Sequence, residues 1–117
     1  MHYSGQCHCG SIKFSFETPS IIEGLTCNCS LCIRKGAIMS RFILSDAELV
    51  RTIDNNALAT YTFGTDLAQH HFCNQCGIYP FHQTLRKPGF YRVNLNCLDD
   101  LDLKALQVTE FDGANLL

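Results

Sequence analysis

CHCG at residues 7–10 and CNQCG at residues 73–77 are two cysteine pairs far apart in the sequence, and each is followed directly by glycine. A glycine in that position can adopt a positive φ, which turns the chain so that backbone amides point at thiolate sulfurs. Two such turns facing each other supply four thiolates, the closed tetrahedral ligand set of a structural zinc ion. We therefore predict a zinc site formed by Cys7, Cys9, Cys73 and Cys76.

Two alternatives for these pairs stay open. The spacing of Cys73 and Cys76 also occurs in thioredoxin-type redox pairs, but that motif opens a helix, and the residues after Gly77 have the pattern of a strand. His8 lies between two of the cysteines and could itself bind the metal. A solvent-facing His8 is more typical, because the neighbours on both sides face the metal.

A third cluster, CNCSLC at residues 27–32, contains three cysteines within six residues. One loop of this length can wrap a second zinc with the sulfurs of Cys27, Cys29 and Cys32 and leave the fourth tetrahedral position open. An open position is the arrangement of catalytic zinc. An exogenous thiol is a natural fourth ligand, because zinc stabilises the thiolate form. These three cysteines are therefore the candidate catalytic residues.

The third cluster also has other interpretations. A fourth protein ligand would make it a second structural site, and the candidates are Cys97, His70, His71 and His82. Alternatively, the zinc is labile and the loop cysteines act as nucleophiles. Arg34 and Lys35 follow the cluster directly. They could offset its negative charge, bind a carboxylate of an acidic thiol, or form a solvated turn.

The composition indicates one soluble domain over residues 1–117, with 46% apolar and 17% charged residues. A net charge of -2 excludes the basic footprint of a nucleic-acid-binding protein. No apolar run approaches the roughly 20 residues of a membrane helix, and the first residues lack signal-peptide features. We therefore expect a cytoplasmic protein. Disulfides are disfavoured there, so eight cysteines indicate metal binding or catalysis.

The remaining sequence predicts mainly short antiparallel strands, with the cysteines on loops. Residues 11–17 alternate polar and apolar side chains with a period of two, which is typical of a half-buried strand. Further strands are predicted at residues 37–44, 58–63 (closed by Gly64), 67–72, 77–84, 90–95 and 106–111. Helical signals are limited to a capping box at residues 45–48 and a turn of helix within residues 28–35. Metal sites would add the stability that so small a core cannot supply.

The three cysteine clusters, in this order, resemble the glutathione-dependent formaldehyde-activating enzyme family, which includes centromere protein V. The matching stretches are GQCHCG at residues 5–10, CNCSLC at residues 27–32 and FCNQCG at residues 72–77. VNLNCL at residues 93–98 and FDG at residues 111–113 are similar to the short members of this family. The resemblance covers nearly the whole chain.

The resemblance implies a β-tent fold of antiparallel sheets held by a structural zinc on the residues matching Cys7, Cys9, Cys73 and Cys76. It implies a catalytic zinc on those matching Cys27, Cys29 and Cys32. The implied activity is that of a carbon–sulfur lyase or synthase, which joins glutathione and formaldehyde as S-hydroxymethylglutathione. Glutathione, or a similar small thiol, and a small aldehyde are therefore the expected partners.

Two other functions fit the same residues. A non-enzymatic zinc module that binds a protein partner would use both metals as structural ions. The β-tent fold is shared with methionine sulfoxide reductase B, so a redox enzyme using Cys97 is the other alternative. That function requires an exposed Cys97 with a lowered pKa. Its position after an alternating strand is more typical of a small buried hydrophobe.

The sequence gives weaker evidence for the roles of the aromatic and acidic residues near the clusters than for the roles of the cysteines. Phe72, Tyr79 and Phe81 could wall an apolar cleft beside the open site or belong to the core. Asp112 and the pair at residues 99–100 are interpreted as solvated turns. Neighbours His70 and His71 should face opposite sides of their strand, with one of the two exposed.

Overall fold

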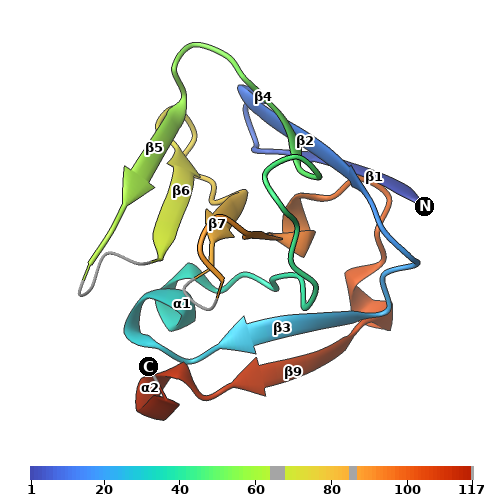
Figure 1. The fold of residues 1–117 in the computed structure, drawn as a ribbon, viewed down its shortest axis with the longest axis vertical. Coiled ribbons are helices and arrows are strands. Elements are labelled where there is room, and N and C mark those ends of the chain that lie inside the picture. Colours follow the sequence, from blue (N-terminus) through green and yellow to red (C-terminus); the bar gives the residue numbers. More distant parts are fainter. Residues whose placement is uncertain (64–67, 85–86, 117) are drawn as a thin grey trace.

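The computed structural model describes residues 1–63, 68–84 and 87–116, which form short strands and very little helix (Figure 1). The strands are β1 (His2–Gln6), β2 (Ile12–Glu17), β3 (Glu23–Cys27), β4 (Val50–Ile53), β5 (Leu58–Tyr61), β6 (Gln69–Cys73), β7 (Phe81–Gln83), β8 (Tyr91–Val93) and β9 (Gln107–Phe111). The helices are α1 (Ser30–Lys35), α2 (Gly113–Leu116) and the 3-10 turns η1 (Leu95–Cys97) and η2 (Leu103–Ala105). No helix in the described ranges is long and apolar enough to cross a membrane.

The strands form three sheets. Two are antiparallel, with strand orders β1-β2-β4 and β5-β6-β7-β8, and the third is the parallel pair β3-β9. In Figure 1 the two antiparallel sheets slope down opposite sides of the molecule, and β3 and β9 run across its base. The predicted mainly β, largely antiparallel architecture is confirmed, with β3-β9 as the parallel exception.

The core lies between the two antiparallel sheets. Ile12, Phe14 and Phe16 alternate along β2 with exposed or half-buried residues, as the period of two predicts, and each is at most 3% exposed. Phe14 meets Phe81 of the opposite sheet edge-on, with ring centroids 5.9 Å apart. Each such buried side chain contributes about 1.5–3 kcal/mol of hydrophobic free energy. Packing between the sheets therefore fixes their relative position and that of the turns at their ends.

The predicted strand at residues 37–44 is wrong. This segment crosses between sheets and makes only isolated bridges, from Met39 to Leu25 and Asn94 and from Leu44 to Tyr91. This segment connects the β3-β9 pair to the β5-β6-β7-β8 sheet. Its apolar residues are therefore buried, although it does not pair continuously with any strand. Burial alone does not distinguish such a crossing from a strand.

Other predicted elements differ in their ends. The strand expected at residues 90–95 stops at Val93, because the Asn94 side chain accepts from the Asn96 amide and starts η1. The strand expected at residues 77–84 is only the three residues of β7. The capping box at residues 45–48 forms both reciprocal bonds, at 2.8 and 3.2 Å, but closes only a turn. Gly64 and Leu67, at two predicted strand ends, lie outside the described residues.

Candidate metal centres

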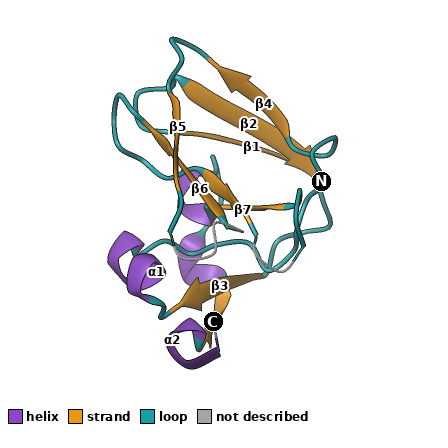
Figure 2. Cartoon of the chain, turned by 60° about the vertical axis from the view of Figure 1, so that its left-hand side comes forward, coloured by secondary structure: helices purple, strands orange, loops and turns teal. Residues whose placement is uncertain are grey.

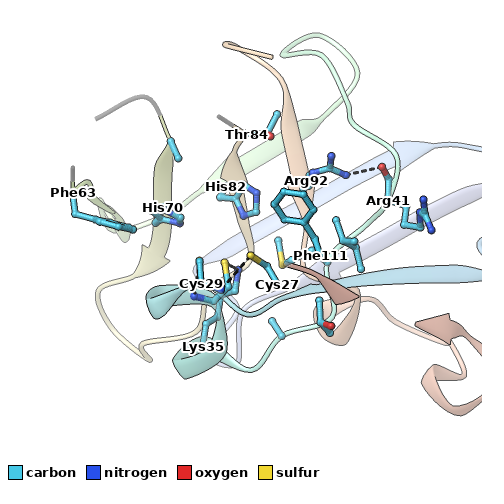
Figure 3. A pocket seen from close by; sticks show the side chains of 16 residues that line it. Cys27, Cys29, Lys35, Arg41, Phe63, His70, His82, Thr84, Arg92 and Phe111 are labelled. Carbon is cyan, nitrogen blue, oxygen red and sulfur yellow. Dashed lines mark hydrogen bonds between the residues drawn. The ribbon is translucent and has the colours of Figure 1, made fainter. Parts of the chain in front are cut away.

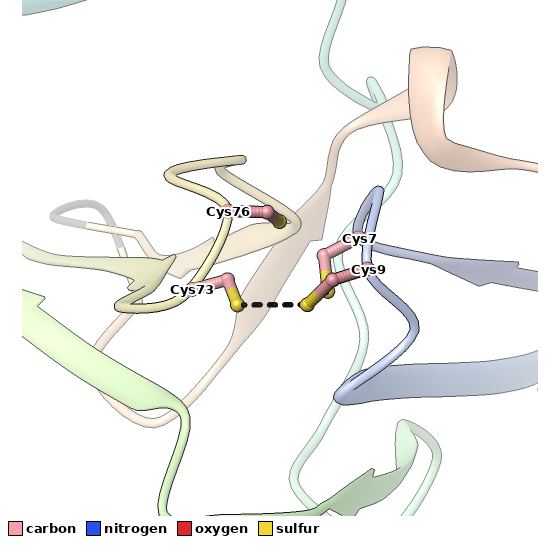
Figure 4. A group of neighbouring side chains, drawn as sticks. All are labelled: Cys7, Cys9, Cys73 and Cys76. Carbon is pink, nitrogen blue, oxygen red and sulfur yellow. Dashed lines mark hydrogen bonds between the residues drawn. The ribbon is translucent and has the colours of Figure 1, made fainter.

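The first two cysteine pairs meet in space, although more than 60 residues separate them (Figure 4). The sulfurs of Cys7, Cys9, Cys73 and Cys76 all lie within 4.8 Å of one another. Two of these separations are 3.7 Å, from Cys7 to Cys9, and 3.6 Å, from Cys9 to Cys73. A tetrahedral zinc with bonds of about 2.3 Å needs sulfurs about 3.8 Å apart. The four residues therefore fit a zinc ion with no open position.

Each pair sits on a turn of the predicted kind. Gly10 and Gly77 have φ values of +82° and +80°, and their amides donate back to the first cysteine of each pair. The Ile12 amide lies 3.4 Å from the sulfur of Cys7, and the amide two residues after Cys73 makes the same contact at 3.4 Å. These amides offset part of the negative charge of four thiolates.

This first site is continuous with the core. Cys7 and Cys73 are fully buried, whereas Cys9 is exposed at the rim. His8 is exposed and is not part of the donor group among the described residues. Cys97 is half-buried nearby without joining the group, and burial raises the pKa of its thiol to about 12. Its surroundings are those of an inert thiol and not of a reactive one.

The third cluster forms a separate site. The sulfurs of Cys27, Cys29 and Cys32 lie within 4.8 Å of one another, and no histidine, cysteine or carboxylate from the described ranges completes the group. The four proposed closing ligands, Cys97, His70, His71 and His82, therefore do not join it. Three sulfurs at this spacing are compatible with a zinc ion that has one position available.

Local structure explains the shape of this second site. β3 ends at Cys27, and α1 begins after Cys29, whose sulfur caps the helix by accepting from the Cys32 amide at 3.4 Å. The predicted turn of helix in residues 28–35 is confirmed. None of the residues of α1 is buried, so the loop and helix lie on the molecular surface beside the base strands (Figure 2).

Lys35 supplies the positive charge beside this cluster. Its Nζ lies 3.7 Å from the Cys32 sulfur and 4.1 Å from the centre of the Tyr79 ring. Partial burial raises the pKa of Cys32 to about 12, and the charge of Lys35 opposes that rise. Arg34 instead points away, donating to the carbonyl of Ser30 at 2.7 Å. Of the two cations considered, Lys35 is the one that offsets the thiolates.

The end of the chain holds the loop of the second site. Asn28 donates from Nδ2 to the carboxylate of Asp112 at 3.0 Å and accepts from the amide of Ala114 at 2.9 Å. The Asn28 amide also donates to the carbonyl of Phe111 at 3.2 Å. Hydrogen bonds from Asn115 and Asn28 hold the pKa of Asp112 below its usual value. Asp112 is exposed, as its interpretation as a solvated residue predicts, but it is also a partner of the cysteine loop.

A pocket of about 520 Å³ opens onto the three sulfurs (Figure 3). It has the size of a small-molecule site. Its walls are mainly apolar, with two histidines and three cations; the lining residues are Leu25, Thr26, Cys27, Cys29, Cys32, Lys35, Ala37, Met39, Arg41, Phe63, Ala68, His70, His82, Thr84, Arg92 and Phe111. Phe72, Tyr79 and Phe81 do not line this pocket; Phe81 belongs to the core, and Tyr79 lies behind the lining residues Lys35 and His70.

The histidines of β6 face opposite sides, as predicted. His70 lines the pocket and shares a hydrogen bond of 2.5 Å with the Tyr79 hydroxyl, whereas His71 pairs with Thr60 at 2.9 Å. Both are buried, at 7% and 5% exposure, so the expected exposed partner is not found. Burial lowers the pKa of His70 to about 4, which keeps its ring neutral at physiological pH. His82 lies beside His70, and its buried Nδ1 has no hydrogen-bond partner among the described residues.

Comparison with known proteins agrees with this architecture. The model of the family described as glutathione-dependent formaldehyde-activating enzyme matches residues 2–111. The chain belongs to this family. A crystal structure of a Rhodobacter sphaeroides protein is 33% identical and superposes with a TM-score of 0.78. The match covers 91% of this chain and 99% of that one. The family assignment made from the cysteine spacing is thereby confirmed.

Proposed function

We propose that the protein joins a small thiol, glutathione, to formaldehyde as S-hydroxymethylglutathione and catalyses the reverse lyase reaction. The observation that carries this proposal is the three-sulfur cluster at the wall of a 520 Å³ pocket, with no fourth donor from the described residues. Membership of the glutathione-dependent formaldehyde-activating family supports the choice of substrates. We further propose that residues 1–117 act as one cytoplasmic domain, where the thiols stay reduced.

Cys27, Cys29 and Cys32 are the proposed ligands of a zinc ion at this wall. When bound, zinc lowers the pKa of a thiol ligand and favours its thiolate. The other four cysteines are the proposed ligands of the structural zinc, because their set is complete and continuous with the core.

The reaction forms one sulfur–carbon bond and breaks the π bond of the aldehyde. The proton lost by the thiol is balanced by one gained by the aldehyde oxygen. Lys35 offsets the negative charge of the cluster from 3.7 Å, and the pocket walls around the thiol are mainly apolar. The neutral ring of His70, oriented by Tyr79, can offer a hydrogen bond at the pocket wall.

The test follows adduct formation by NMR in mixtures of zinc-loaded protein, glutathione and formaldehyde. We expect a rate above the uncatalysed reaction for the wild type and the uncatalysed rate for Cys29→Ser. Serine is itself a good helix N-cap, so this variant removes the sulfur while preserving the start of α1. A wild-type rate equal to the uncatalysed one would refute the proposed substrates.

The redox alternative has less support. It requires an exposed Cys97 with a lowered pKa, whereas this thiol is half-buried and its pKa is raised to about 12. If the protein were a non-enzymatic zinc module, both metals would be structural and the two sites should be buried to a similar degree. Their different burial argues against that, since Cys7 and Cys73 are fully buried and α1 has no buried residue.

A further inference from the structure

Apart from the three sulfurs, the charged side chains among the described residues of the pocket beside Cys27, Cys29 and Cys32 are all positive. Three of its lining residues are cations, Lys35, Arg41 and Arg92, and none of its lining residues within the described ranges is Asp or Glu. The chain as a whole carries a net charge of -2, so this bias is local. Apolar walls of Leu25, Met39 and other residues strengthen the attraction of these cations for an anion.

The cations are divided between two parts of the pocket. Lys35 is beside the sulfur of Cys32, at 3.7 Å. The two arginines are next to each other, because Arg92 Nη1 donates to the carbonyl of Arg41 at 2.6 Å and to that of Ser40 at 2.9 Å (Figure 3). In this view Arg41 and Arg92 lie on the far side of Phe111 from Lys35.

Arg41 has guanidinium donors available to a ligand. Its Nη1 donates to the hydroxyl of Thr109 at 3.2 Å, and its Nε forms an exposed ion pair with Glu23, 3.9 Å from the carboxylate oxygen. That separation is too long for a hydrogen bond. A guanidinium has five N–H groups in a planar fork that matches a carboxylate. Arg92 fixes the backbone that carries this fork through its bond to the Arg41 carbonyl.

We propose that Arg41, held in place by Arg92, binds a carboxylate of the thiol substrate while the thiol lies at the cysteine cluster. The substrate class is therefore thiols that carry a carboxylate at some distance from the sulfur, and neutral or cationic thiols are poor substrates. This inference rests on the proposed function of the same pocket, and it assigns substrate selection to residues outside the cysteine motifs.

The experiment measures dissociation constants for glutathione and for its diethyl ester, in which both carboxylates are masked and the thiol is kept. The zinc-loaded wild type should bind the ester about tenfold more weakly. Arg41→Gln should weaken glutathione binding about tenfold and reduce the difference between glutathione and the ester. Arg34→Gln is the matched control, because this exposed arginine does not line the pocket.

The outcomes separate this inference from the proposed function. Equal binding of glutathione and its ester, with catalysis intact, would overturn the carboxylate site and leave the proposed function standing. Binding of neither thiol would overturn both. An Arg41→Gln effect equal on glutathione and ester would also overturn the inference, because a structural effect does not distinguish the two ligands. Circular dichroism of each variant checks that the fold is retained.

Discussion

The two cysteine sites use the same chemical group in opposite surroundings. The site of Cys7, Cys9, Cys73 and Cys76 joins turns of the two antiparallel sheets, and two of its cysteines are fully buried. The site of Cys27, Cys29 and Cys32 lies on a short loop and a six-residue helix with no buried residue. A complete ligand set that reaches into the core suits a structural metal, whereas an incomplete set beside a pocket suits a reactive one. Ligand count and depth in the molecule, and not residue type, therefore distinguish the two sites.

The largest expected effect is on folding. Cys73→Ser should unfold most of the chain, because structural zinc contributes about 10 kcal/mol in small domains whose total stability is about 5–15 kcal/mol. Cys29→Ser should lower the melting temperature by only a few degrees while abolishing activity. Thermal unfolding followed by circular dichroism, with excess zinc, measures both. Equal loss of stability in the two variants would show that both metals are structural.

The next effect concerns the hydrogen bonds between Asn28 and the end of the chain. Asp112→Ala should weaken zinc binding at the second site by roughly 10- to 100-fold, the usual cost of losing a group that orients metal ligands. Zinc at the first site should be unaffected. Competition with a chromophoric chelator resolves the two affinities. Asp99→Ala, which removes another exposed carboxylate, is the control and should change neither.

Charge compensation by Lys35 gives a smaller expected effect. Lys35→Gln removes the cation 3.7 Å from the Cys32 sulfur and should weaken zinc binding at the second site about tenfold. The charge at the first site is offset by backbone amides, so its affinity should stay the same. Arg34→Gln, one residue earlier and pointing away, provides the comparison. If both variants lost affinity equally, general surface charge would explain the effect.

The smallest expected effect is a pH dependence of folding stability, caused by His70 at the pocket wall. His70 has a pKa of about 4 in the folded chain and about 6.5 when unfolded, so the unfolded state binds more protons between these values. Stability therefore falls as the pH decreases through this range. From pH 7 to 5, the wild type should lose about 1 kcal/mol more than His70→Gln; this is roughly half the full linkage value, because water enters the pocket.

Denaturant unfolding at the two pH values, with zinc in excess, measures the His70 effect. Loss of metal in acid affects the wild type and the variant equally and cancels in the difference. His8→Gln, at an exposed position outside the pocket, should behave as the wild type does. An equal loss in the wild type and His70→Gln would show that this histidine is not buried as described.

Much of the two sites could be predicted from the sequence, because cysteine spacing and the following glycines are local signals. Gly10 and Gly77 have the expected positive φ, and the clusters meet as their spacing suggests. Strands with clear alternation, such as β2, were also predictable. The missed strands β1, β3 and β4 lack that pattern; β4, for example, has no buried residue.

What the sequence could not indicate depends on contacts between distant segments. The partnership of Asn28 and Asp112 arises because β3 and β9 pair in parallel, which brings residues 84 positions apart together. The Arg41 and Arg92 pair depends in the same way on the crossing segment at residues 37–44, which was predicted to be a strand. Neither pair has a local sequence signal.

The central claim, that one site is structural and the other open, is tested most directly by metal content during mild chelation. We predict two zinc ions per chain, one removed by EDTA with the circular dichroism spectrum unchanged and the other removed only with unfolding. Readdition of zinc should restore the second ion and the activity together. Simultaneous loss of both ions, or unfolding on loss of the first, would contradict the claim.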